Sequence, residues 1–417
     1  MLSLALGFAQ NRLGDTGFTP ASFFYGGAQG VWFDPSDLTT MFQDSAGTTP
    51  VTAVGQPVGL ILDKKYNTNW LITGLDTFTV TPAGTTPPTA NGTDTFLGVP
   101  CISVTIPVNT GGYAVCRADG GGASQFNIGV GNYYKQTYQI ALSRALTGAE
   151  GVAVYTTGMT GSAQYITLTS TSPSSAWISA STNFTAVATG NDAPTVFAQT
   201  AINSPVTVYV RQYSVVEYAG NHASQATSAN RPVLQQDANN CYYLAFNGTN
   251  SSLSTAAINF TATDKMTVWA GVRKLSDATT GILTELSVDT SVNNGSFAAI
   301  APDGANKFSF RSRGTIAATA TTASAAYNAP YTAVISGIGD ISGANVAFNI
   351  NGALANQVTT SQGTGTFGTY PLYIGARAGT SLFFNGNLYG LIVLGAASTA
   401  QEIASTEAYM NGKTRAY

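Results

Sequence analysis

Residues able to perform acid–base or nucleophilic chemistry are few and widely separated in this 417-residue chain. Its single histidine is His222, so any Ser-His-Asp or Cys-His arrangement would have to use it. That residue stands in the polar stretch Asn221-His-Ala-Ser224, where a hydrogen-bonded structural contact is the commoner role. We therefore predict no catalytic residue, no histidine-based metal site and no cofactor, and we expect that the protein is not an enzyme.

Oxygen ligands for Ca²⁺ are the second chemistry to consider. The best cluster joins Asp289, Asn293 and Asn294 with Asp303-Gly304. The same residue types are the ordinary residues of turns, so the pattern does not predict a metal site.

Three cysteines leave two interpretations open. Cys101 and Cys116 are spaced to pair across a hairpin, which would leave Cys241 alone. Alternatively, all three are buried thiols.

Composition excludes several function classes. Charged residues make up 9% of the chain, against about 25% in ordinary domains. With 44% hydrophobic residues and a net charge of −3, the chain is not disordered, and it lacks the basic patch of a nucleic-acid-binding protein. No apolar run is long enough for a transmembrane helix, so we predict no membrane insertion. The apolar start, Met1–Gln10, lacks a basic leader, so we expect no export signal.

The elements that would position any site divide the chain into three regions. Residues 1–65 are irregular, and residues 66–218 and 219–417 each contain period-2 strands rich in Thr, Val, Ile and Tyr, separated by turn clusters. We predict an all-β fold in which a jelly-roll-like β-sandwich is followed by a second β-sandwich. Asn351-Gly352 predicts a hairpin turn. One helix is predicted near the end, capped by Ser398 with Gln401 and stopped at Asn411-Gly412.

The first region, residues 1–65, is unusually aromatic for a segment without periodic runs. It either straps across the domain that follows it or docks its rings on a neighbouring subunit. For the second interpretation the docking residues are Phe23, Phe24, Tyr25, Trp32, Phe33, Asp34 and Phe42.

The third region resembles laminin-G/concanavalin-A-like lectin domains. The resemblance rests on Tyr243-Leu-Ala-Phe-Asn-Gly248, Val268-Trp-Ala-Gly271, Ile350-Asn-Gly352, Tyr373-Ile-Gly375 and Phe384–Val393, which occur in the order of that family, followed by a short terminal helix. It implies a concanavalin-A-like (laminin-G-like) β-sandwich over residues 219–417. It also implies binding of sugars, for which aromatic residues in or beside loops are the candidates, namely Tyr327, Tyr331, Tyr370 and Phe383; each of them is alternatively a core or interface residue.

Lectin-like folds include glucanases, which carry three acids at alternate positions of one strand. Glycoside hydrolysis needs a carboxyl pair at a defined separation. The five glutamates are Glu150, Glu217, Glu285, Glu402 and Glu407, and the nearest segment, Thr284-Glu-Leu-Ser-Val-Asp289, has only two acids, four positions apart. It departs from the glucanase pattern, which argues against hydrolysis.

Two further segments resemble parts of tailed-phage virion proteins. They are the leader, Trp32–Leu38 and Met41–Gly59, and the linker, Gly220–Thr227 with Arg231-Pro232. The resemblance implies a phage virion surface structural protein of fibre, spike or decoration type, located on the particle. Its partners would be other virion proteins, further copies of the chain and host-surface polysaccharide, but not nucleic acid. The alternatives are a secreted bacterial carbohydrate-binding adhesin, a capsule-degrading polysaccharide hydrolase, and a purely structural cement protein.

Overall fold

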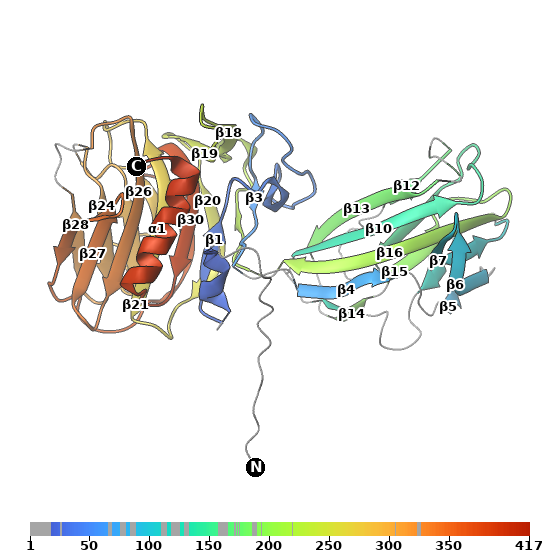
Figure 1. Ribbon diagram of the computed structural model, residues 1–417, viewed down its shortest axis with the longest axis horizontal. Helices are drawn as coiled ribbons and strands as arrows, with labels where there is room; N and C mark the ends of the chain where they lie inside the picture. Colours follow the sequence, from blue (N-terminus) through green and yellow to red (C-terminus); the bar gives the residue numbers. More distant parts are fainter. Residues whose placement is uncertain are drawn as a thin grey trace, which may run out of the picture.

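The computed structural model contains two β-sandwich units, one built from the middle of the chain and the other from both of its ends (Figure 1). It describes residues 18–25, 27–65, 69–75, 81–83, 89–109, 115–117, 126–128, 133–156, 166–170, 172, 174, 176–185, 190–192, 194–218, 220–304, 306–322 and 327–417. In this part of the chain no helix has the length and apolar character needed to cross a membrane.

The middle unit is a jelly roll. Its strands are β4 (Asn69–Leu75), β5 (Thr81–Ala83), β6 (Thr89–Phe96), β7 (Val99–Ile106), β8 (Val115–Arg117), β9 (Phe126–Ile128), β10 (Tyr133–Leu142), β11 (Val152–Thr156), β12 (Ile166–Leu168), β13 (Ile178–Thr185), β14 (Gly190–Asp192), β15 (Pro194–Ala198) and β16 (Val206–Tyr218). The order β7-β16-β10-β13 in one sheet and β8-β15-β11-β12 in the other is that of a jelly roll with two Greek keys. The predicted jelly-roll-like sandwich is thus confirmed.

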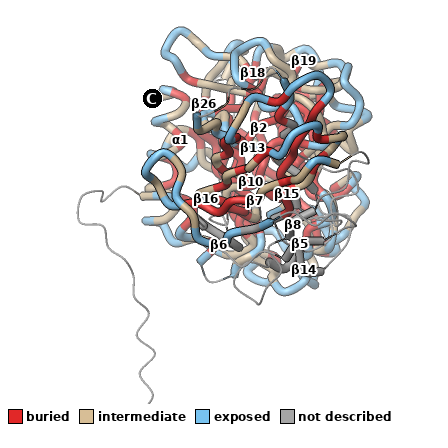
Figure 2. Tube along the Cα trace, turned by 90° about the vertical axis from the view of Figure 1, so that its right-hand side faces the viewer, coloured by how far each residue is buried: buried red, intermediate tan, exposed pale blue. Residues whose placement is uncertain are grey.

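Alternation along β10 shows why these residues form a half-buried strand. Tyr134, Gln136 and Tyr138 point into the sandwich, whereas Lys135 and Thr137 between them are partly exposed. The buried Tyr138 hydroxyl has a partner, since it donates to the Val154 carbonyl across the core (3.0 Å). Figure 2 shows the buried stretches of β10, β16 and β7 in this unit.

The second unit packs two large antiparallel sheets around one core. Its strands are β17 (Ala223–Ser224), β18 (Val233–Gln236), β19 (Tyr242–Asn247), β20 (Leu253–Asn259), β21 (Lys265–Lys274), β22 (Ile282–Leu286), β23 (Ser296–Ile300), β24 (Ser309–Arg313), β25 (Ala317–Thr321), β26 (Tyr331–Asp340), β27 (Asn345–Ile350), β28 (Ala353–Val358), β29 (Thr369–Ile374) and β30 (Asn385–Leu394), with a 3₁₀ turn at η3 (Ser228–Asn230). The first sheet has the order β18-β19-β30-β21-β26-β27-β28 and the second ends β20-β29-β22-β23-β24-β25. The predicted turn at Asn351-Gly352 joins β27 to β28, and both of its residues have positive φ, as a type I′ turn requires.

The leader belongs to this second unit. Its elements are η1 (Pro20–Phe24), β1 (Gly30–Phe33), η2 (Leu38–Thr40), β2 (Met41–Phe42) and β3 (Leu60–Ile61). β1 pairs with residues 391–394 of β30. β19 pairs with residues 385–388 of the same strand, so β19 and β1 follow one another along β30. β2 and β3 extend the other sheet through β17. The leader therefore straps across the last domain, not across the jelly roll that follows it in sequence.

This placement corrects the predicted docking residues. Phe24, Trp32, Phe33, Asp34 and Phe42 are buried by this chain's own side chains, and the ring of Phe23 stacks on Trp269 at 5.4 Å. Of these predicted residues, Tyr25 is 68% exposed and Phe23 is half-buried. The prediction that these residues are exposed docking side chains is wrong, because most of their rings fill this chain's own core. Attachment of the leader to another protein stays a prediction.

An ion-pair cluster at Asp34 fastens the leader to the C-terminal helix. The Asp34 carboxylate lies 2.9 Å from the Lys413 ammonium and 3.1 Å from that of Lys64. Burial would raise the pKa of Asp34, but the charges of the two lysines outweigh it and lower the pKa to about 2. The cluster thus joins residues nearly 380 positions apart.

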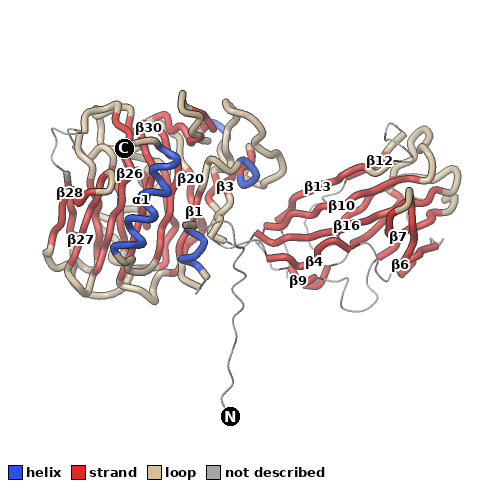
Figure 3. Tube along the Cα trace, viewed as in Figure 1, coloured by secondary structure: helices blue, strands red, loops and turns tan. Residues whose placement is uncertain are grey.

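The single α-helix among the described residues, α1 (Ala400–Thr414), covers the outer face of β21, β26 and β30 (Figure 3). Thr399 and Glu402 form its capping box, one residue beyond the predicted Ser398 and Gln401. It continues through Asn411-Gly412 and ends at Arg415, which takes the left-handed conformation. The helix is confirmed, and the predicted cap and stop residues are wrong.

The cysteines whose side chains are described are thiols. Cys101 and Cys241 are both buried and neither is part of a disulfide. The side chain of Cys116 lies outside the described residues.

Candidate functional site

Glu285 and Asp289, the two acids that came nearest to the glucanase pattern, both contact the Arg377 guanidinium. Glu285 is fully buried on β22, and its carboxylate accepts hydrogen bonds from Arg377 Nε (3.0 Å) and Nη2 (3.1 Å) and from the Thr290 N–H (2.7 Å). Arg377 Nη1 also lies 3.1 Å from Asp289 Oδ1.

The surroundings of Asp289 do not suit a catalytic acid. Burial tends to raise the pKa of Asp289, but hydrogen bonds from Ser291 and the Arg377 charge lower it overall. A glycosidase acid needs a raised pKa. The arrangement ties together the loops around residues 287–295 and 375–381.

His222 makes the structural contact predicted for it. Its Nδ1 accepts the N–H of Asp63 (2.9 Å), so this nitrogen carries no proton. The Asp63 carboxylate accepts the N–H groups of Trp32 and Asn221, both at 2.8 Å. Histidine and aspartate thus join the leader to the linker.

The residues considered for Ca²⁺ do not form one cluster. Asp289, Asn293 and Asn294 precede β23, whereas Asp303 follows it and accepts the Ser309 hydroxyl (2.7 Å). Within the described ranges no group of three or more His, Cys, Asp or Glu side chains is arranged to hold a metal ion.

Three of the four aromatic candidates for sugar binding lie at one end of the second unit. Tyr327 and Tyr331 meet edge to face at 5.2 Å, and both pack against Phe308. Phe383 leads into β30, whose first residues lie beside the same loops, as shown by the hydrogen bond from Leu275 N–H to the Asn385 carbonyl (3.0 Å).

Tyr370 lies elsewhere. It begins β29 at the opposite end of the sandwich, where its hydroxyl donates to the Asn294 carbonyl (3.0 Å). All four rings are half-buried. The structure therefore brings Tyr327 and Tyr331 into contact, places Phe383 near the same end of the sandwich, and puts Tyr370 at the opposite end.

A buried lysine holds the loops under this face. Lys274 is fully buried, and its ammonium donates to Asp277 Oδ1 (2.5 Å) and to the Asn306 carbonyl (2.7 Å), and lies 4.9 Å from the centre of the Phe308 ring. Burial lowers the pKa of Lys274, while Asp277 opposes the shift. Asp277 in turn accepts the Ala329 N–H (2.6 Å), so three loops are tied together beneath the tyrosines. Sequence reasoning missed this network, because nothing in the pattern brings residues 274, 306 and 329 together.

Neutral amides surround the face. Asn351 Nδ2 donates to the Tyr331 hydroxyl (3.3 Å), and the side chains of Asn306 and Asn328 are hydrogen-bonded to each other. Aromatic rings beside amides suit a neutral, hydroxyl-rich ligand, because the rings cover apolar C–H surfaces while the amides both donate and accept hydrogen bonds.

Comparison with known proteins gives the following similarities. Residues 246–404 match the Laminin_G_3 family model, described as the concanavalin A-like lectin/glucanases superfamily. The chain is similar to the Ruminococcus gnavus IT-sialidase CBM40 bound to alpha2,3 sialyllactose (16% identity, 35% of this chain and 83% of that chain, TM-score 0.29). It is also similar to the heptameric SAP-like pentraxin from Limulus polyphemus (12% identity, 38% and 78%, TM-score 0.31).

A third similarity is to the K499G mutant of NanB sialidase from Streptococcus pneumoniae, at 15% identity and a TM-score of 0.31. It covers 39% of this chain but 27% of the sialidase. At these TM-scores the structural similarities carry no functional argument. The search of curated proteins found no match.

Proposed function

We propose that this protein is a structural protein on the surface of a phage particle. We further propose that its C-terminal unit, which contains a concanavalin A-like lectin domain, binds glycans of the host surface. The observation that carries the first part is that the two segments resembling virion proteins fold together as one element.

That element is built from close backbone contacts. Leader strand β3 pairs with linker strand β17, and the Gln225 N–H donates to the Gly59 carbonyl (2.8 Å). The Val58 N–H donates to the Pro232 carbonyl (2.8 Å), and Arg231 Nη1 donates to the Gln43 carbonyl (2.9 Å). Two stretches about 170 positions apart thus behave as one motif, which supports a common origin for both resemblances.

Glycan binding is supported by the lectin-like fold and by the face at Tyr327 and Tyr331. Most rings of the leader are buried within the C-terminal unit. Other proteins of the particle and further copies of this chain would therefore contact the outer surface of that unit.

A glycan array and a pull-down with host polysaccharide, using full-length protein, test the binding. The double variant Tyr327→Ala/Tyr331→Ala should lose binding, and Tyr370→Ala, the same truncation at the opposite end of the sandwich, should retain it. Binding that survives the double variant contradicts the proposed face. Release of new reducing ends from the polysaccharide would instead identify a hydrolase.

Antibody-gold labelling of purified particles tests the location. We expect labelled particles. Protein found free in culture medium and absent from particles would favour a secreted adhesin.

A further inference from the structure

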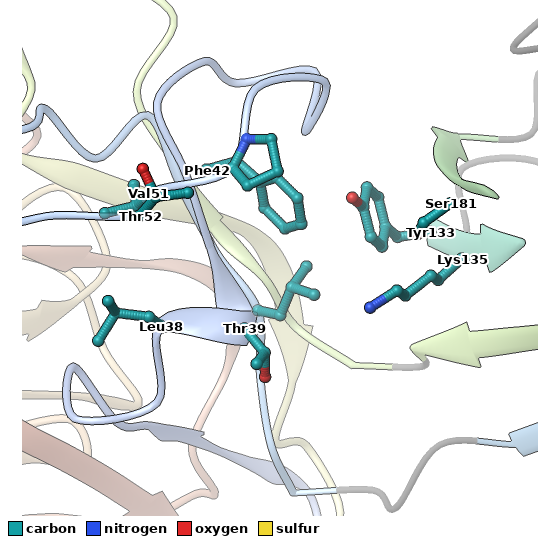
Figure 4. Close-up of a pocket in the computed structure, with 10 residues that line it drawn as sticks. Leu38, Thr39, Phe42, Val51, Thr52, Tyr133, Lys135 and Ser181 are labelled. Atoms are coloured by element: carbon teal, nitrogen blue, oxygen red, sulfur yellow. The ribbon is translucent and has the colours of Figure 1, made fainter. Parts of the chain in front are cut away.

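A hollow separates the two units where the leader meets the jelly roll. Figure 4 shows leader residues such as Phe42 and Leu38 on one side and Tyr133, Lys135 and Ser181 on the other. It encloses about 370 Å³, within the range of small-ligand sites, which often occur between domains. The sequence gives no signal for it, because its walls come from residues 38–62 and 133–181.

Its wall is fixed by a hydrogen bond across the junction. The Tyr133 hydroxyl donates to the Gly47 carbonyl (3.0 Å), and its ring lies 5.4 Å from Phe42. Gly47 has φ +74°, and a Cβ there would lie 2.5 Å from the Tyr133 ring, so only glycine allows this approach. Phe42, Leu60, Leu62 and Tyr133 form a small apolar cluster of their own.

One cation faces this apolar wall. Lys135 projects from β10 with its ammonium group directed into the hollow (Figure 4). Among the described residues, no carboxylate forms an ion pair with it, in contrast to Lys64, Lys65, Lys265, Lys274 and Lys413. A charge of this kind beside apolar rings favours an anionic ligand.

The hollow continues as a polar groove over the jelly roll. A second depression, about 340 Å³, shares Lys135 and Ser181 with the first. Its further polar lining is Thr137, Gln139, Ser179 and Gln212, from β10, β13 and β16. An acyl chain would find no apolar surface of matching length here, whereas sugar hydroxyls would find amides and hydroxyls.

We propose that this continuous groove binds an acidic oligosaccharide. A sugar carboxylate pairs with the Lys135 ammonium, the sugar ring packs against the accessible leader side chains Leu38 and Pro50, and the next sugars extend along β10 and β13. The site is separate from the lectin-like face of the proposed function and does not depend on it.

Isothermal titration calorimetry of the full-length protein with three probes tests the proposal: hexagalacturonic acid, neutral cellohexaose and oleate. We expect hexagalacturonic acid to bind more tightly than cellohexaose and oleate not to bind. Lys135→Gln should weaken the acidic hexamer about tenfold, equivalent to about 1.4 kcal/mol. Ser181→Tyr, on an exposed strand position shared by both depressions, should abolish its binding.

Lys307→Gln is the matched control, since it removes the same charge on the lectin-like domain and should leave binding unchanged. Unaltered affinity of Lys135→Gln, preference for oleate, or absence of any binding by the acidic hexamer overturns the proposal. Binding of the acidic hexamer that is lost in Tyr327→Ala/Tyr331→Ala but kept in Lys135→Gln and Ser181→Tyr also overturns it, and leaves the proposed function intact.

Discussion

Replacing Phe33 with alanine should destabilise the whole C-terminal unit, and not only the leader that carries this residue. Phe33 is 1% exposed, pairs with Leu391 of β30 and belongs to the same core cluster as Phe246. Truncating a buried phenylalanine costs about 3–5 kcal/mol. In a unit of this size each kcal/mol lowers Tm by about 2–4 °C, so we expect a fall of about 6–20 °C.

Differential scanning calorimetry of the full-length protein measures this effect. Phe246→Ala, from β19 of the lectin-like domain, is the matched variant and should lower the same transition by a similar amount. Val104→Ala, in the jelly-roll core, should leave that transition unchanged. If Phe33→Ala leaves the transition in place while Phe246→Ala lowers it, the leader is a detachable segment and our reasoning is refuted.

Four further variants test individual contacts. Asp34→Asn should lower the free energy of unfolding by about 2 kcal/mol at pH 7, because the pKa of Asp34 is about 2 in the fold and 3.8 in the unfolded chain. This contribution is present above about pH 3.8 and is lost as the pH falls towards 2, so guanidinium unfolding at pH 7 and near pH 2 should show the difference shrinking in acid. Glu285→Ala should cost about 3–5 kcal/mol in the same assay, since it leaves Arg377 without its buried partner. Thr399→Ala should cost about 1 kcal/mol of unfolding free energy and Ser398→Ala almost nothing, and equal costs would contradict the observed cap.

The structure also changes how docking must be tested. Deleting residues 1–65 would remove Val31, Phe33, Met41, Val51, Val58 and Ile61 from the core of the C-terminal unit. Loss of particle attachment after such a deletion would report unfolding. Tyr25→Ala, which alters an exposed ring and leaves the core intact, tests docking more directly.

Strand alternation and turn chemistry made the two sandwiches predictable, because they are local properties of the sequence. The hairpin at Asn351-Gly352 is an example, since its positive φ angles favour those two residue types. β1 could not be predicted in this way. It has four residues, all buried, and its partner β30 lies about 360 positions further along the chain, so no local pattern marks the pairing.

The candidate site was predictable in residue type but not in placement. Aromatic residues were recognised in the leader and in the loops, yet composition does not tell a ring that fills a core from one that faces a ligand. Phe33 and Tyr25 differ by eight positions and have opposite environments. The observed helix cap lies one residue beyond the predicted one, because Ser398 and Thr399 both begin an S/T-x-x-E/Q pattern. The structure uses Thr399, whose pattern ends in the charged Glu402.

The most direct test of the central claim is quantitative mass spectrometry across a density gradient of purified phage particles from the source strain. We predict that this chain co-sediments with the particles at a fixed copy number relative to their other structural proteins. Recovery of the chain only from the particle-free fractions would contradict a role as a particle surface protein.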